Sequence, residues 1–74
     1  MIRVTRHALA RYQQRIARVG MREARRRILE HSPALEAATA FGAPCVRNSD
    51  GVRFLLRDGY VTTVLAPGMP LGPQ

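Results

Sequence analysis

The chain has 74 residues and a formal net charge of +7, and 46% of its residues are hydrophobic. This length makes one small domain, and this apolar content is typical of a globular chain rather than a disordered one. The single cysteine, Cys45, excludes an intramolecular disulfide, and a small chain without disulfides is expected to be cytoplasmic. No apolar run approaches the roughly 18 residues of a membrane span, so none is expected.

The positive charge is concentrated in the first part of the chain. Residues 1–31 contain nine arginines against two acidic residues, Glu23 and Glu30, whereas residues 32–74 contain three arginines and three acidic residues. All twelve basic residues are arginines, a composition that a GC-rich genome also produces without selection for function. A small domain of this charge attracts polyanions, which is an argument about its partners rather than its fold.

The first expected elements are a short strand and a long helix. Residues 2–4 alternate as a strand, and Thr5 follows as the N-cap of a helix over residues 6–19 that ends at Gly20. Helical spacing places five polar side chains within an arc of about 100°. This arginine face consists of His7, Arg11, Gln14, Arg15 and Arg18. Like charges one turn apart weaken an isolated helix, and no acidic residue precedes Glu23, so the arginine face is either an anion-binding site or a solvated surface.

A second helix is expected over residues 21–31, and its arginines differ from those of the first. Glu23 stands four residues before Arg27, and Arg26 stands four before Glu30, so this cluster has local acidic partners and is mostly solvated surface. A Ser-Pro pair at residues 32–33 caps a new short helical segment that runs to about residue 41.

After a loop at residues 42–44 the periodicity changes from helical to two-residue alternation. Strands are expected over residues 45–47, 52–56 and 60–65, with turns at residues 48–51 and at Asp58-Gly59. The order predicts an α+β fold: a strand, two helices and a short helix, then a three-stranded antiparallel meander, with the helices on one face of the sheet. Residues 1–65 form the single domain, and residues 66–74 form a Pro/Gly-rich flexible tail.

Few side chains can move a proton near neutral pH: His7, His31 and Cys45. They have no metal-ligand spacing, and no glycine-rich loop joins a strand to a helix, so neither a metal nor another cofactor is expected. His7 lies in the first helical turn, where the helix dipole and nearby arginines disfavour a protonated imidazole. A neutral histidine beside guanidinium groups suits metal-free cleavage of a phosphodiester, and a surface or packing histidine is the plainer alternative.

The motif T-R-H-A at residues 5–8, followed by Arg11 and Arg15, resembles the T/S-x-H-A-x-x-R-x-x-x-R opening of small RelE-like proteins. Glu23-Ala24 and Ile28 are similar to the second helix of that pattern, and residues 53–56, the Asp-Gly turn and V-T-T-V at residues 61–64 are similar to its last hairpin. The resemblance covers residues 2–65. It implies the fold group of RelE toxins and colicin-type RNases, many of whose members are metal-independent RNases, with His7, Arg11, Arg15 and Thr63 as the candidate catalytic site.

Three functions remain open. The first is an endoribonuclease of toxin or phage origin that binds RNA through Arg6, Arg11, Gln14, Arg15, Arg18 and Arg22. The second is a non-catalytic basic module that binds a nucleic acid or an acidic protein, such as a phage-encoded inhibitor. The third is a subunit of an oligomer whose arginines meet an acidic partner. The expected partners are therefore RNA or another polyanion, an acidic protein such as an antitoxin, and a second copy in a homodimer, with no membrane.

Overall fold

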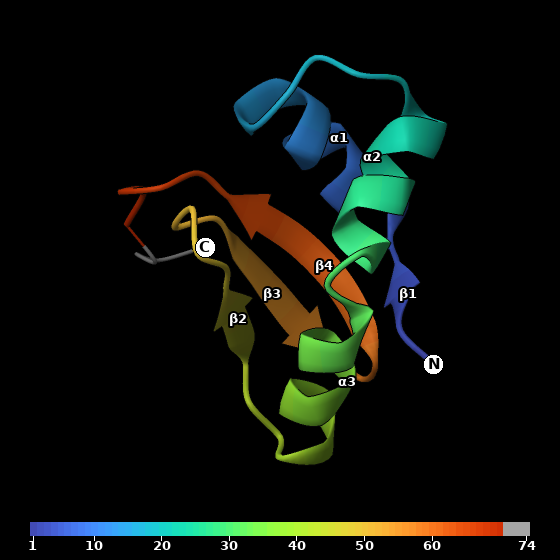
Figure 1. Cartoon of the computed structure of the whole chain (residues 1–74), viewed down its shortest axis with the longest axis vertical. Coiled ribbons are helices and arrows are strands. Elements are labelled where there is room, and N and C mark those ends of the chain that lie inside the picture. Colours follow the sequence, from blue (N-terminus) through green and yellow to red (C-terminus); the bar gives the residue numbers. More distant parts are fainter. Residues whose placement is uncertain (71–74) are drawn as a thin grey trace.

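The computed structural model describes residues 1–70 and has an α+β fold with three helices and a four-stranded mixed sheet (Figure 1). The helices are α1 (Arg6–Arg15), α2 (Met21–Leu29) and α3 (Ser32–Ala40). The strands are β1 (Arg3–Val4), β2 (Cys45–Arg47), β3 (Arg53–Arg57) and β4 (Tyr60–Leu65). Their order in the sheet is β1-β4-β3-β2, and β1 runs parallel to β4 while the other neighbours are antiparallel. The predicted α+β class is confirmed, and the sheet is mixed because β1 is added at the edge of β4.

Short-range chemistry explains two of the connections. The Thr5 hydroxyl accepts a hydrogen bond from the backbone N–H of Ala8 at 3.0 Å, which confirms Thr5 as the N-cap of α1. Asp58 and Gly59 both have positive φ, 53° and 81°, as the two central residues of a type I′ hairpin turn require. These residues therefore set the register in which β3 and β4 pair.

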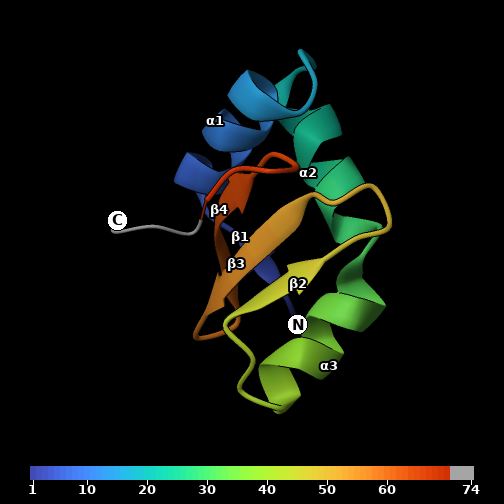
Figure 2. The same ribbon diagram turned by 90° about the vertical axis from the view of Figure 1, so that its left-hand side faces the viewer.

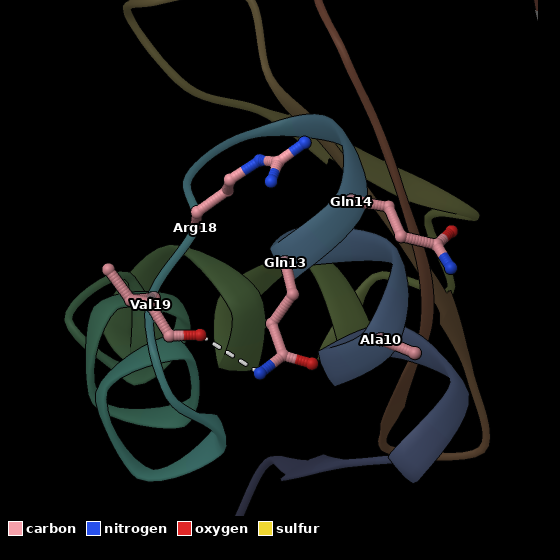
Figure 3. Close-up of a pocket in the computed structure, with 5 residues that line it drawn as sticks. All are labelled: Ala10, Gln13, Gln14, Arg18 and Val19. Carbon is pink, nitrogen blue, oxygen red and sulfur yellow. Dashed lines mark hydrogen bonds between the residues drawn. The ribbon is translucent and has the colours of Figure 1, made fainter.

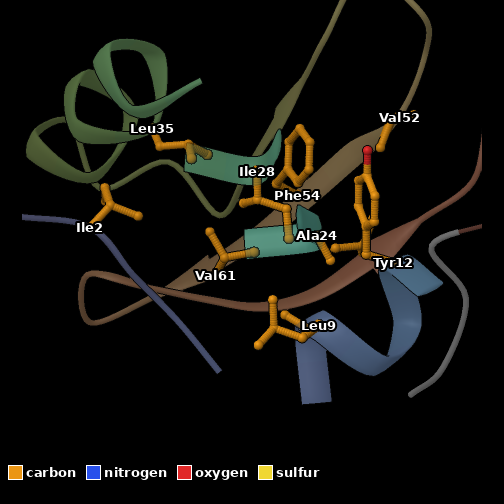
Figure 4. Packing of buried hydrophobic residues seen from close by; sticks show 11 residues of the cluster. Ile2, Leu9, Tyr12, Ala24, Ile28, Leu35, Val52, Phe54 and Val61 are labelled. Carbon is orange, nitrogen blue, oxygen red and sulfur yellow. The ribbon is translucent and has the colours of Figure 1, made fainter. Parts of the chain in front are cut away.

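The helices pack against one face of the sheet, and the hydrophobic core lies between them (Figures 1 and 2). Figure 4 shows its central side chains: Leu9 of α1, Ile28 of α2, Leu35 of α3, and Phe54 and Val61 of the sheet. Each of these five is at most 1% exposed. All three helices contribute to this one core, so the fold depends on long-range packing rather than on any helix alone.

A β-bulge decides which residues of β4 face the helices. Val61 and Val64 are both completely buried in the core, although residues three apart in a regular strand point to opposite faces. The register shifts here, because Leu55 pairs with Thr63 but Leu56 pairs with Val61. The extra residue, Thr62, lets both valines face the core and turns Thr63 to the opposite face of the sheet.

The first helix is shorter than predicted. α1 ends at Arg15, not at residue 19, and Gly20 has φ −66° and is the N-cap of α2 rather than a left-handed residue that ends α1. The amide N–H groups of residues 16 and 17 both donate to the Tyr12 carbonyl, and the Gln13 side chain donates to the Val19 carbonyl at 2.9 Å. These bonds turn the chain toward α2, which overrides the helical periodicity of residues 16–19.

The predicted strands at residues 45–47 and 60–65 are confirmed, and the remaining boundaries lie within two residues of the predictions; residues 71–74 of the predicted tail lie outside the described residues. Within the described part of that tail, the Met69 and Ala66 carbonyls accept hydrogen bonds from the Arg53 side chain. Residues 66–70 are thereby tied to β3.

Candidate nucleic-acid interface

Four members of the predicted arginine face lie on α1, and the fifth lies beyond its end. His7 is exposed in the first turn and forms no hydrogen bond or ion pair with any of residues 1–70. Arg11 donates to the Gln14 side-chain oxygen at 2.7 Å, which leaves its other guanidinium N–H groups free of protein partners in this part of the chain. α1 carries no acidic residue, so its positive charge is not neutralised within the helix.

Arg15 has a structural partner that sequence reasoning missed. Its guanidinium donates to the backbone carbonyl of Val64 at 2.9 Å, and the group is half-buried. β1 pairs only with Tyr60 and Val61, so the rest of this edge of β4 has no neighbouring strand among residues 1–70. Arg15 therefore satisfies a carbonyl that the short β1 leaves unpaired.

Thr5 ties the other end of α1 to the same edge. Its hydroxyl donates to the Thr62 carbonyl at 3.3 Å, and its backbone N–H donates to the Val61 carbonyl at 3.0 Å. The helix is thus attached to β4 at two points, on either side of Thr63. A hydroxyl and a guanidinium act here in place of a strand.

The four candidate catalytic residues are not joined into one cluster. Arg15 contacts the residue next to Thr63, but the Thr63 side chain is on the sheet face opposite the helices. His7 and Arg11 lie one helical turn apart on the outer side of α1. The structure therefore places the histidine and the threonine on different surfaces, joined at the β4 edge by Arg15.

Gln14 and Arg18 border the same depression even though the helix ends between them. With Ala10, Gln13 and Val19 they line an open depression of ≈ 450 Å³ between α1 and the connection to α2 (Figure 3). The Gln13 bond to the Val19 carbonyl holds this connection against the helix (Figure 3). Arg6 and Arg22, the remaining predicted RNA-binding residues, are exposed and form no ion pair within residues 1–70.

Two of the four arginines of α2, Arg26 and Arg27, have the local acidic partners predicted for them. Arg26 contacts Glu23 at 2.6 Å and Glu30 at 2.7 Å, and Arg27 contacts Glu23 at 2.8 Å. Hydrogen bonds from Arg26 and then Arg27 lower the pKa of Glu23 to about 2. Glu23 and Glu30 raise the pKa of Arg26, and Glu23 followed by the Tyr12 hydroxyl raises the pKa of Arg27. α2 therefore offers less free positive charge to a ligand than its number of arginines indicates.

Within residues 1–70 no three His, Cys, Asp or Glu side chains are grouped as they would be around a metal ion. None of the described helices has both the length and the apolar character needed to cross a membrane. Comparisons of the chain with models of protein families, with curated proteins and with solved structures gave no match.

Proposed function

We propose that this protein binds RNA through α1 and the connection that follows it. The observation that carries the proposal is the difference between the two basic helices. Two of the four α2 arginines, Arg26 and Arg27, bind carboxylates, whereas among the described residues no arginine of α1 or of the connection after it does, and Arg18 lines an open depression. Unneutralised guanidinium groups on a surface attract phosphates and position a nucleic acid without reading its sequence.

Binding by this surface has a specific salt signature. Each phosphate contact made by an arginine releases condensed counterions, so log K falls with log[salt] by about 0.7 per contact for a single strand. Arg11→Ala removes one contact and lowers both the affinity and the slope. Arg26→Ala is the matched control, because Arg26 is also an exposed helical arginine but is held by Glu23 and Glu30.

The test is fluorescence anisotropy of a labelled single-stranded RNA at several salt concentrations. Arg11→Ala is expected to reduce affinity more than Arg26→Ala does and to lower the salt slope by about 0.7. Equal effects of the two substitutions would show that the charge acts diffusely and would refute the α1 surface.

RNA cleavage is a second candidate function, favoured by His7, an exposed histidine one turn from Arg11 on a helix that has no acidic residue. His7 would be the general acid or base, and Arg11 and Arg15 would stabilise the transition state; Thr63, on the other face of the sheet, would position the phosphate only of an RNA that crosses the β4 edge. On the RelE-like resemblance, this protein would be a toxin or phage protein with an acidic partner such as an antitoxin.

Cleavage is tested with wild type and His7→Ala on total RNA and on translating ribosomes. We expect cleavage that survives EDTA and leaves a 2′,3′-cyclic phosphate, and a loss of roughly 100- to 10,000-fold in rate for His7→Ala with RNA affinity retained. If neither protein cuts either substrate, or both cut equally, the protein is a binding module and not an enzyme.

A further inference from the structure

The sheet face opposite the helices, here called the open face, carries a second set of arginines. On β1 the core residues Ile2 and Val4 alternate with Arg3, and on β3 Phe54 and Leu56 alternate with the other residues. Strand alternation therefore points a defined set of side chains away from the helices. They are Arg3, Cys45, Arg47, Arg53, Leu55, Arg57, Tyr60, Thr63 and Leu65.

One row of the open face combines an aromatic ring with two arginines. Tyr60 pairs in register with Arg3 on one side and with Arg57 on the other. In the antiparallel pair the Cβ atoms of Arg57 and Tyr60 are about 5 Å apart, and Arg3 is the neighbour of Tyr60 on the parallel side. Both arginines are exposed and Tyr60 is 41% exposed, at the end of the sheet where β1 meets the β3–β4 turn (Figure 1).

The other end of the open face is also positive. Arg47 and Arg53 stand directly opposite each other, an arrangement of like charges that destabilises a sheet. They line a hollow of ≈ 330 Å³ together with residues of the tail. Arg53 lies four residues before Arg57 on β3, which places the two ends about 13 Å apart.

No acidic residue compensates for this charge. None of the four arginines of the open face forms an ion pair within the described chain, and the nearest carboxylate in sequence, Asp58, belongs to the turn. Between the two ends lie Thr63, Leu55 and Cys45, which are uncharged and only partly exposed. Because Arg53 donates to the Ala66 and Met69 carbonyls of the tail, a ligand that fits this face has its anionic groups at the Arg3 and Arg57 end and a flat apolar group over the tyrosine.

We propose that the open face binds single-stranded RNA, with one base stacked on Tyr60 and the flanking phosphates held by Arg3 and Arg57. Stacking on an aromatic ring inside a positive groove is how proteins hold single strands, whose bases are unpaired and accessible. Duplex RNA keeps its bases stacked inside the helix and offers only its phosphates. This inference rests on the proposal that the protein binds RNA. It places the RNA on a different surface from α1 and specifies that the RNA is single-stranded.

The experiment compares Tyr60→Ala, Tyr60→Phe and Phe41→Ala for binding to a single-stranded RNA, to the same strand without bases at its central nucleotides, and to a duplex. Phe41 is the matched control, because it is 89% exposed but lies at the end of α3 rather than on a strand. Tyr60→Ala is expected to lose roughly 5- to 150-fold in affinity for the intact strand, the range for one lost stack, with the salt slope unchanged. Tyr60→Phe and Phe41→Ala should bind like wild type, and the abasic strand and the duplex should not distinguish the variants.

Tyrosine fluorescence gives a second measurement that does not require Tyr60→Ala to fold. The chain contains two tyrosines and no tryptophan, and Tyr12 is only 7% exposed. In a Tyr12→Phe background the emission comes from Tyr60, and a stacked base should quench it on addition of the intact strand but not of the abasic strand.

The outcomes separate the two RNA surfaces. If Arg11→Ala weakens binding while Tyr60→Ala and Arg57→Ala do not, the open-face proposal is overturned and the α1 proposal stands. If the Tyr60 and Arg57 substitutions weaken binding and Arg11→Ala does not, the reverse holds. A wild-type protein that binds no RNA would overturn both.

Discussion

Arg15 offers the sharpest test of how this fold uses its arginines, because its guanidinium bonds to a backbone carbonyl rather than to an acid. Arg15→Ala removes the 2.9 Å hydrogen bond to Val64 and leaves that carbonyl at the sheet edge without its partner. A hydrogen bond made by a charged group contributes about 1.5–3 kcal/mol. Since Arg15 is only half-buried, water can partly replace the hydrogen bond that the Val64 carbonyl loses. We therefore expect Arg15→Ala to lower the free energy of unfolding by about 1–2 kcal/mol.

Arg11→Ala is the matched control, because it makes the same substitution one turn earlier on the same helix. Arg11 bonds only to the exposed Gln14, and such pairs contribute about 0.2–0.5 kcal/mol. In a domain of this size 1 kcal/mol shifts Tm by roughly 4–8 °C, so Arg15→Ala should melt about 4–16 °C below wild type and Arg11→Ala within about 4 °C of it.

The assay is thermal and urea unfolding followed by circular dichroism, with Arg15→Met as a third variant. Methionine keeps most of the aliphatic stem but has no hydrogen-bond donor. The Tm of Arg15→Met should therefore be close to that of Arg15→Ala if the hydrogen bond stabilises the fold, and close to that of wild type if packing of the stem does. Equal Tm values for Arg15→Ala and Arg11→Ala would refute the assignment of Arg15 to the sheet edge, and would return it to the set of free RNA-binding arginines.

Three further predictions test local features of the fold. Thr5→Ala should cost about 1–2 kcal/mol in urea unfolding, because it removes both the cap of α1 and the bond to β4, whereas Thr5→Ser should retain most of the stability. Gly59→Ala should cost about 1–2 kcal/mol because φ is 81° there, and Asp58→Gly, at φ 53°, should be near neutral; similar losses for both would contradict a type I′ turn. The lowered pKa of Glu23 makes its stabilising contribution complete above the unfolded value of 4.5 and lost as pH falls toward 2, so a Tm–pH profile should steepen in that window and flatten in Glu23→Gln.

Features that depend on neighbouring residues could be predicted from the sequence. The Thr5 cap and the Asp58-Gly59 turn are determined within three or four residues, and both occur where the sequence places them. The Glu23–Arg27 and Arg26–Glu30 pairs follow from helical spacing alone. The change from helical to alternating periodicity likewise predicted where the strands begin.

Features that depend on distant residues could not be predicted from the sequence. The end of α1 at Arg15 is decided by the turn into α2 and by the Gln13 side chain, while the apolar periodicity of the sequence continues to Val19. The bulge at Thr62 is seen only in the pairing of β4 with β3. It lets both Val61 and Val64 enter the core, which depends on packing against distant residues. Without knowing this bulge, one cannot tell from the sequence which face of the sheet carries Thr63. One therefore cannot tell whether Thr63 lies near His7, Arg11 and Arg15.

The same limit explains why counting arginines does not locate a binding surface. Arginines of one charge and one shape have three different environments here: Arg26 binds carboxylates, Arg15 binds a carbonyl, and Arg57 binds neither within the described chain. Only the third kind has both its charge and its donors available to a ligand. Such arginines lie on both sides of the β1–β4 edge, on α1 and on the open face, and Arg15 bridges that edge. A single strand that crosses the edge would contact both surfaces, so the α1 and Tyr60 substitutions should then lower affinity together by more than either does alone.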